Sequence, residues 1–134
     1  LTANDAVICL LNLDAQQFNI PDCRVRKLSL QKNHSRENLR HFQTSFAKLM
    51  ADYGVDKVVI RERAVKGKFA GGAVSFKLES AIQLIADLEV ELLSATTIKN
   101  ALTESPLPVP FVDTGLKVFQ EAAFNVAYAA QVLR

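Results

Sequence analysis

Glu62 is the residue whose type and position best suit chemistry. This acid directly follows the apolar run 58–60 and lies between Arg61 and Arg63. In α/β proteins, binding and catalytic sites gather at the carboxyl ends of parallel strands. Because side chains alternate along a strand, we expect Glu62 to share the face of Ile60, with Arg61 on the other face. Two interpretations follow: a functional carboxylate, or an exposed ion pair at the end of a strand.

A basic, glycine-rich loop follows this acid and offers groups that bind anions. It contains Lys66, Lys68, Gly71 and Gly72. Glycine lets backbone N–H groups approach a ligand closely, and the N-terminus of the helix expected after the loop favours an anion. The spacing fits neither a Walker A loop nor a dinucleotide fingerprint. The alternative is a simple turn between a strand and a helix.

The remaining candidates for chemistry are fewer. Glu121 lies in an alanine-rich stretch, where a buried carboxylate would need a cation or metal as a partner. No nucleophile pairs with His34 or His41, so schemes based on a Ser, Cys or Lys nucleophile lack support. Two cysteines, Cys9 and Cys23, are too few for a disulfide framework, and we expect buried, reduced thiols in a cytoplasmic protein.

Charge is unevenly distributed along the 134 residues. The chain has 16 Lys and Arg against 14 Asp and Glu, a formal net charge of +2. Residues 24–68, however, contain twelve bases and four acids, while both flanking regions are acidic. A basic segment between acidic ends indicates a face that binds a polyanion such as nucleic acid. The alternative is a set of ordinary solvated helix and strand faces.

The elements that would position these residues follow from hydrophobic periodicity. Apolar or alternating runs predict strands at 6–11, 23–30, 57–60 and 89–93. Helical spacing predicts helices from the N-cap Ser35 to Gly54, over 73–85, from the N-cap Ser94 to about 103, and over 114–133.

This order of elements predicts one α/β domain over 1–134. The early strands are joined by short connections and favour antiparallel pairing, whereas the later strand–helix–strand crossover favours parallel pairing. We therefore expect a mixed sheet, an antiparallel meander beside parallel strands, with helices on both faces. No apolar run is long enough for a membrane-spanning helix, and residues 1–13 do not read as a signal peptide.

Several of these segments resemble bacterial Holliday junction resolvases of the RuvC type. The similarity lies in the strand ending at Glu62 with its glycine-rich exit, in 92–102 (LLSATTIKNAL) with Lys99, and in 121–127 (EAAFNVA). It implies a ribonuclease H-like fold in which Glu62 and Glu121 bind Mg²⁺ or Mn²⁺. Lys99 would then position phosphate or a metal-bound water, and Glu62, Glu121 and Lys99 would be the catalytic residues.

The pattern departs from that family at two places. A second acid of the last helix would fall at Phe124, which cannot bind metal. The family's first strand and its acid would lie before Leu1. Over its full length the chain more closely resembles the bacterial domain-of-unknown-function 3010 family, which brings no established activity.

Three hypotheses for the function remain open. The first is a resolvase-like, magnesium-dependent nuclease that holds the nucleic-acid backbone, with DNA favoured, through Arg61, Arg63, Lys66, Lys68, Gly71 and Gly72. The second is a binding module for nucleic acid that kept the fold and lost its metal ligands. The third is an interaction protein that uses the sheet for oligomerisation, for instance as a homodimer. None of the three needs a membrane.

Overall fold

The computed structural model describes residues 1, 4–14, 17–30, 35–63 and 72–133. In order, the elements are the strands β1 (Asp5–Val7), β2 (Asn12–Asp14), β3 (Gln17–Asn19) and β4 (Lys27–Ser29), helix α1 (Arg36–Asp52), strand β5 (Lys57–Arg61), helix α2 (Ala73–Gln83), strand β6 (Glu89–Leu93), helix α3 (Ala95–Glu104), the 3₁₀ turns η1 (Phe111–Thr114) and η2 (Val118–Gln120), and helix α4 (Glu121–Val132). Within this part of the chain, no helix combines the length and apolar character that a membrane span requires.

The strands form three separate pairs. β1 pairs with β4 and β2 with β3, both antiparallel, whereas β5 and β6 are parallel. The predicted mixture of antiparallel and parallel strands in an α/β fold is therefore confirmed. One continuous mixed sheet is not formed among the described residues, since β1 and β5 each pair on one side only.

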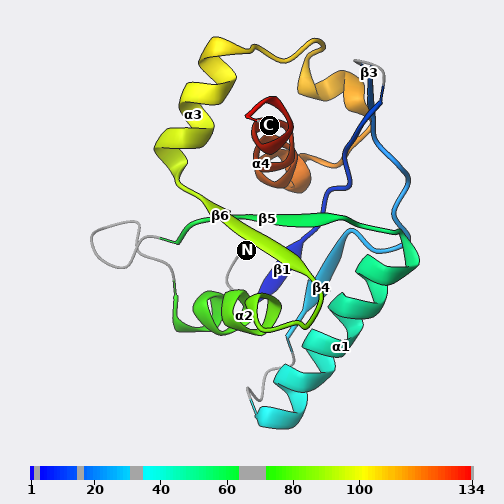
Figure 1. Cartoon of the computed structure of the whole chain (residues 1–134), viewed down its shortest axis with the longest axis vertical. Helices are drawn as coiled ribbons and strands as arrows, with labels where there is room; N and C mark the ends of the chain where they lie inside the picture. Colours follow the sequence, from blue (N-terminus) through cyan, green and yellow to red (C-terminus); the bar gives the residue numbers. More distant parts are fainter. Residues whose placement is uncertain (2–3, 15–16, 31–34, 64–71, 134) are drawn as a thin grey trace.

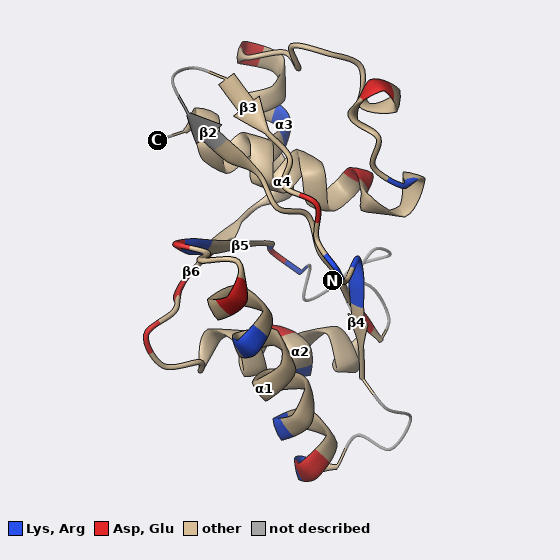
Figure 2. Cartoon of the chain, turned by 90° about the vertical axis from the view of Figure 1, so that its right-hand side faces the viewer, with Lys and Arg blue, Asp and Glu red and all other residues tan. Residues whose placement is uncertain are grey.

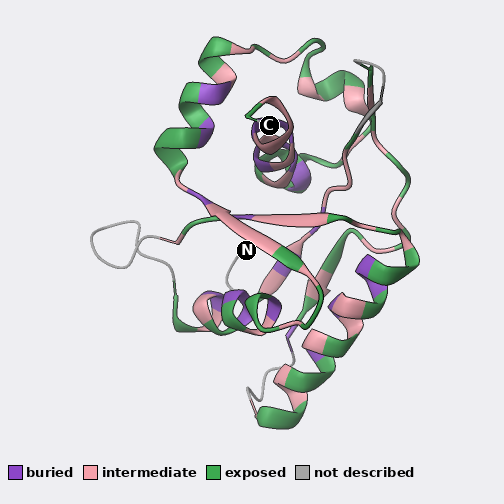
Figure 3. Cartoon of the chain, in the orientation of Figure 1, coloured by how far each residue is buried: buried purple, intermediate pink, exposed green. Residues whose placement is uncertain are grey.

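Helices cover both faces of the β5–β6 pair, as predicted (Figure 1). α1 and α2 lie on one face, and α3 and α4 on the other. Val58 and Ile60 belong to the core shared with α1 and α2, while Val59 belongs to the core shared with α3 and α4. This division follows from the alternation of side chains along β5. Buried residues are correspondingly distributed over both layers (Figure 3).

Local signals in the sequence set the ends of the helices. Ser35 and Ser94 are the N-caps of α1 and α3, and each side-chain oxygen accepts a hydrogen bond from a backbone N–H of the first turn. Beyond the end of α1, Gly54 has a φ of +60°, a left-handed conformation that glycine adopts without steric cost. The predicted caps and the predicted role of Gly54 are thus confirmed.

Three segments are shorter than the sequence pattern predicts. The strand expected over 6–11 is limited to β1, the strand expected over 23–30 is limited to β4, and the helix expected from 114 begins only at Glu121. Before α4, Gly115 takes a left-handed φ of +79° and ends η1, so the chain turns before the helix begins. The sequence pattern does not predict this turn, because helical periodicity continues through the apolar stretch over which the helix was expected, 114–133.

Candidate functional site at the carboxyl end of strand β5

The parallel pairing of β5 and β6 brings two strand ends and a helix start together. Arg61 is opposite Leu93, and the Glu62 N–H donates to the Leu93 carbonyl over 2.8 Å. Ser94 follows at once as the N-cap of α3. The carboxyl end of β5 therefore lies beside the beginning of α3, as Figure 1 shows. This is the edge at which sites of α/β proteins gather.

A second carboxylate, which the sequence analysis missed, lies within electrostatic range of the exposed Glu62. Glu79 of α2 is only 8% exposed, and its Oε1 is buried without a hydrogen-bond partner among the described residues. Burial raises the pKa of Glu79; Arg63 opposes this rise, and the negative charge of Glu62 adds to it. Two acids whose charges interact, the exposed Glu62 and the buried Glu79, thus make up an acid pair at this strand end. The face on which the Glu62 side chain lies stays a prediction.

A sequence signal for Glu79 existed in the helical spacing. Ser75, Leu78, Glu79 and Ile82 are the buried residues of α2, and they recur at intervals of three and four. An acid on an otherwise inward-facing stripe is rare unless it has a partner. Helical spacing predicts Leu78 and Ile82 as inward-facing residues, and Ser75 and Glu79 lie on the same side of α2.

The two arginines beside Glu62 differ in their surroundings. Arg61 is exposed. Arg63 is half-buried; its Nη1 donates to the Leu1 carbonyl, while its Nε is buried without a partner within the described part of the chain. Burial lowers the pKa of Arg63, the positive charge of Arg61 lowers it further, and Glu79 opposes the change. Among the described residues of this edge, Arg61 is thus the base that is exposed and free to meet a ligand in solution.

Glu121 and Lys99, the other residues of the predicted catalytic set, lie on the opposite side of the sheet. Glu121 is the exposed first residue of α4, and Lys99 is exposed on α3. Both helices cover the face of β5 that Val59 contacts, whereas the alternation of side chains predicts the opposite face for Glu62. Among the described residues, the acid whose pKa responds to the charge of Glu62 is Glu79.

The glycine-rich loop is represented here only by its last residue. Lys66, Lys68 and Gly71 lie outside the described residues. Gly72 is the N-cap of α2, and its carbonyl accepts a hydrogen bond of 2.7 Å from the Ser75 hydroxyl. Gly72 therefore occupies the helix start that the sequence predicts, and anion binding there stays a prediction.

A comparison with protein families adds one finding. The model of a family described as "Protein of unknown function (DUF3010)" matches residues 1–130. The chain belongs to this family. No curated protein and no solved structure matches it. Family membership thus agrees with the closer of the two resemblances.

The described residues do not form a complete metal centre. Mg²⁺ requires near-octahedral oxygen coordination, often from one or two carboxylates with waters and substrate phosphates. Glu62 and Glu79 would supply two carboxylates, but no group of three residues of the metal-ligating types is found in the described part of the chain. We therefore derive no catalytic step through a metal from these residues.

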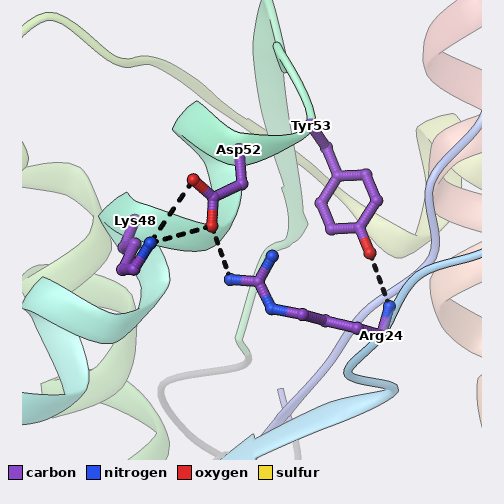
Figure 4. Close-up of polar contacts among 4 residues, drawn as sticks. All are labelled: Arg24, Lys48, Asp52 and Tyr53. Atoms are coloured by element: carbon purple, nitrogen blue, oxygen red, sulfur yellow. Dashed lines mark hydrogen bonds and ion pairs between the residues drawn. The ribbon is translucent and has the colours of Figure 1, made fainter.

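Part of the basic charge of segment 24–68 is neutralised within the fold. Arg24 Nη2 lies 2.7 Å from Asp52 Oδ2, and Lys48 Nζ lies 3.1 Å from the same oxygen (Figure 4). Hydrogen bonds from Lys48 and then Arg24 lower the pKa of Asp52. The Arg24 backbone N–H also donates to the Tyr53 hydroxyl over 2.7 Å. These contacts connect the segment before β4 to the C-terminal end of α1.

The other ion pairs among the described residues involve neither Arg61 nor Lys99. Lys57 pairs with Glu91 and, at 3.9 Å, with Glu89 across the β5–β6 pair. Basic and acidic residues are interspersed over both helical layers in Figure 2. Neither Arg61 nor Lys99 takes part in an ion pair among the described residues. The positive charge available to bind a polyanion is therefore smaller than the number of Lys and Arg residues in segment 24–68 suggests. Arg61, at the carboxyl end of β5, is part of that available charge.

Proposed function

We propose that this protein binds nucleic acid at the carboxyl end of β5, on a ribonuclease H-like arrangement of strands and helices. One observation carries the proposal: the β5–β6 pairing sets the exposed Arg61 at a strand end beside the start of α3. Arginine binds phosphate with a planar, bidentate geometry. The mixed α/β architecture, with helices on both faces, supports the fold part of the proposal.

The chain continues from this edge into the basic loop, which strengthens the electrostatic part of the argument. Lys66 and Lys68 follow Arg63 within five residues, and Gly72 begins α2. Contacts between such bases and phosphates supply most of the sequence-independent affinity for nucleic acid. The resemblance to resolvases favours DNA as the ligand, and the two cysteines favour a cytoplasmic location; both belong to the proposal.

Binding measured against salt tests this function. Each phosphate contact contributes roughly one unit to the slope of log K against log salt concentration. We expect R61Q to weaken binding of duplex and branched DNA and to reduce that slope by about one. The matched control is R40Q, which removes an exposed arginine of α1, away from this edge.

Two results would contradict the proposal. Equal effects of R61Q and R40Q would mean that net charge, rather than this edge, determines binding. An absence of binding to any nucleic acid at low salt would favour the third hypothesis, a protein that uses its surface for oligomerisation. Sedimentation of the wild-type chain would then show whether a homodimer forms.

A second candidate function is metal-dependent cleavage of phosphodiester bonds. The observation that favours it is the acid pair of Glu62 and Glu79, in which a buried carboxylate oxygen lacks a partner among the described residues. Mg²⁺ or Mn²⁺ is the cofactor that such oxygen ligands suit, with Glu121 and Lys99 as the further residues implied by the resemblance.

Cleavage of branched DNA with Mg²⁺ or Mn²⁺ tests this candidate. We expect E62Q to abolish the reaction and E104Q, a change of an exposed carboxylate at the end of α3, to leave it unchanged. Cleavage that survives E62Q would exclude this acid pair as the site. Binding without cleavage under any metal would leave the non-catalytic module.

A further inference from the structure

The turn η2 presents an aromatic ring on the surface of the molecule. Phe119 is 49% exposed, whereas every other aromatic residue in the described part of the chain is buried or half-buried. The Lys27 ammonium of β4 lies over this ring, 5.7 Å from its centre. Exposing a phenyl ring to water costs free energy that burial would recover, so a ring held at the surface beside a cation is typical of a binding surface.

The segment around β1 fixes both sides of this contact. Lys27 belongs to β4, which pairs with β1. The Ile8 carbonyl, directly after β1, accepts a hydrogen bond of 2.8 Å from the Gln120 side chain, next to Phe119. Gln120 is buried, and its Oε1 accepts from the Lys117 N–H over 3.0 Å, which closes the turn η2. The position of the ring is therefore fixed before a ligand binds, and preorganisation of this kind favours affinity.

Basic side chains accompany the ring, although acids lie in the same segments. Arg26, Lys27 and Lys117 are exposed, and none of them forms an ion pair among the described residues. The exposed acids Asp22 and Glu121 lie within four residues of them in the sequence. Positive charge therefore exceeds negative charge only slightly here, so attraction to a polyanion does not by itself select the ligand. The ring has to contribute through stacking.

We propose that Phe119 stacks on an unpaired base of nucleic acid, while Lys27 and Lys117 contact the adjoining phosphates. The inference rests on the proposed function and specifies its ligand, nucleic acid that contains unpaired bases. Every base has an aromatic face, so stacking on a side-chain ring is independent of sequence, whereas neighbouring base pairs cover these faces within a duplex. Phe119 and Arg61 line one cavity of about 570 Å³, so the two contacts border the same hollow.

Tryptophan fluorescence tests the stacking directly. The chain contains no tryptophan, so F119W introduces a single indole at the position of the ring. We expect a short oligothymidylate to quench the emission of F119W, because its bases stack on the indole. The matched control is V112W, which places the indole at an exposed apolar residue of η1. Its emission should change little when oligothymidylate is added.

Affinity and its salt dependence separate stacking from charge. We expect F119A to weaken binding of oligothymidylate by about tenfold or more and F119W to retain it, since a stacked base is lost only in F119A. Binding of a fully paired duplex should be the same in F119A and the wild type. Because stacking releases no counterions, F119A should keep the wild-type slope of log K against log salt concentration, whereas K117Q should reduce that slope by roughly 0.7.

The outcomes separate this inference from the proposed function. If R61Q weakens duplex binding while F119A leaves oligothymidylate binding intact, the edge at β5 stands and the stacking ring is refuted. If F119A weakens single-strand binding while R61Q behaves like R40Q, the ring stands and the edge is refuted. Absence of binding to both nucleic acids at low salt would overturn both. Emission of F119W that responds to phosphatidylglycerol vesicles but not to oligothymidylate would overturn the inference and assign the ring to a membrane surface.

Discussion

Arg63, just past the end of β5, interacts electrostatically with Glu79 of α2, yet each has a buried polar atom without a partner among the described residues. Arg63 Nε and Glu79 Oε1 both lack a hydrogen-bond partner among the described residues, and the two groups form no ion pair there. A buried charge that is incompletely compensated costs free energy. The carboxyl end of β5 therefore contains a destabilising element, as binding sites often do.

The first prediction concerns the pH dependence of stability. Burial raises the pKa of Glu79 above its ordinary value of 4.5, so the folded state favours the protonated acid. The contribution to stability is complete below pH 4.5 and is lost as the pH rises through the folded-state pKa. In E79Q this loss is absent. We expect E79Q to equal the wild type near pH 4 and to exceed it at pH 7 by about 1 kcal/mol in urea unfolding.

The control for this variant is E104Q, which removes an exposed carboxylate. Its pH profile should follow that of the wild type within about 0.5 kcal/mol. If E79Q and wild type lose stability in parallel between pH 4 and pH 7, Glu79 is solvated or compensated in solution. An acid pair of Glu62 and Glu79 would then be excluded as well.

A second prediction concerns Gln120, which joins the two ends of the chain. It is 3% exposed; its Nε2 donates to the Ile8 carbonyl over 2.8 Å, and its Oε1 accepts from the Lys117 N–H over 3.0 Å. Q120A leaves both backbone groups unpaired, at a cost of about 1–3 kcal/mol each at most. We expect a loss of about 2 kcal/mol in thermal or urea unfolding.

The exposed Gln83 provides the comparison for this change. Q83A at the end of α2 should alter stability by less than about 0.5 kcal/mol. A similar small effect for Q120A would mean that water replaces the side chain at Ile8. The start of α4 would then not depend on this contact with the segment after β1.

The N-caps show which parts of this fold the sequence predicts well. Ser94 accepts a hydrogen bond from the Thr97 N–H over 3.1 Å, and Ser35 does the same for Asn38 over 3.2 Å. Both were predicted, because a cap is formed by residues three positions apart. The helical layers and the parallel pairing of β5 and β6 follow from periodicity and element order in the same way.

Contacts between distant residues were not accessible to that reasoning. The bond from Gln120 to Ile8 spans 112 residues, and the electrostatic interaction of Glu79 with Glu62 depends on how α2 packs on β5. The carboxyl end of β5 was therefore predicted as a site, but its second acid was not. The division of the strands into three pairs was missed because no local pattern shows which strand edges meet.

The third prediction tests the cap of α3. S94A removes the acceptor for the Thr97 N–H and should destabilise the protein by about 1 kcal/mol. S80A, at an exposed position within α2, should be neutral or slightly stabilising, since alanine has the higher helix propensity. Denaturant unfolding of both variants measures the difference. If S94A behaves like S80A, the start of α3 beside Glu62 is not fixed by its cap.

The last prediction concerns the reactivity of Cys9. The residue is half-buried and not in a disulfide, and burial, with a smaller contribution from Cys23, raises the pKa of its thiol from 9.0 to about 12. Since the thiolate is the reactive form, the folded protein should hold on the order of 1000-fold less reactive Cys9 than the unfolded chain below pH 9.

The C23S variant isolates the Cys9 thiol, and iodoacetamide labelling followed by mass spectrometry measures its rate of alkylation. The rate should rise about tenfold per pH unit beyond pH 9, where the same thiol in urea has begun to level off. Labelling that levels off near pH 9 in the folded protein would show a solvated thiol, and the packing around β1 would have to be looser than the structure has it.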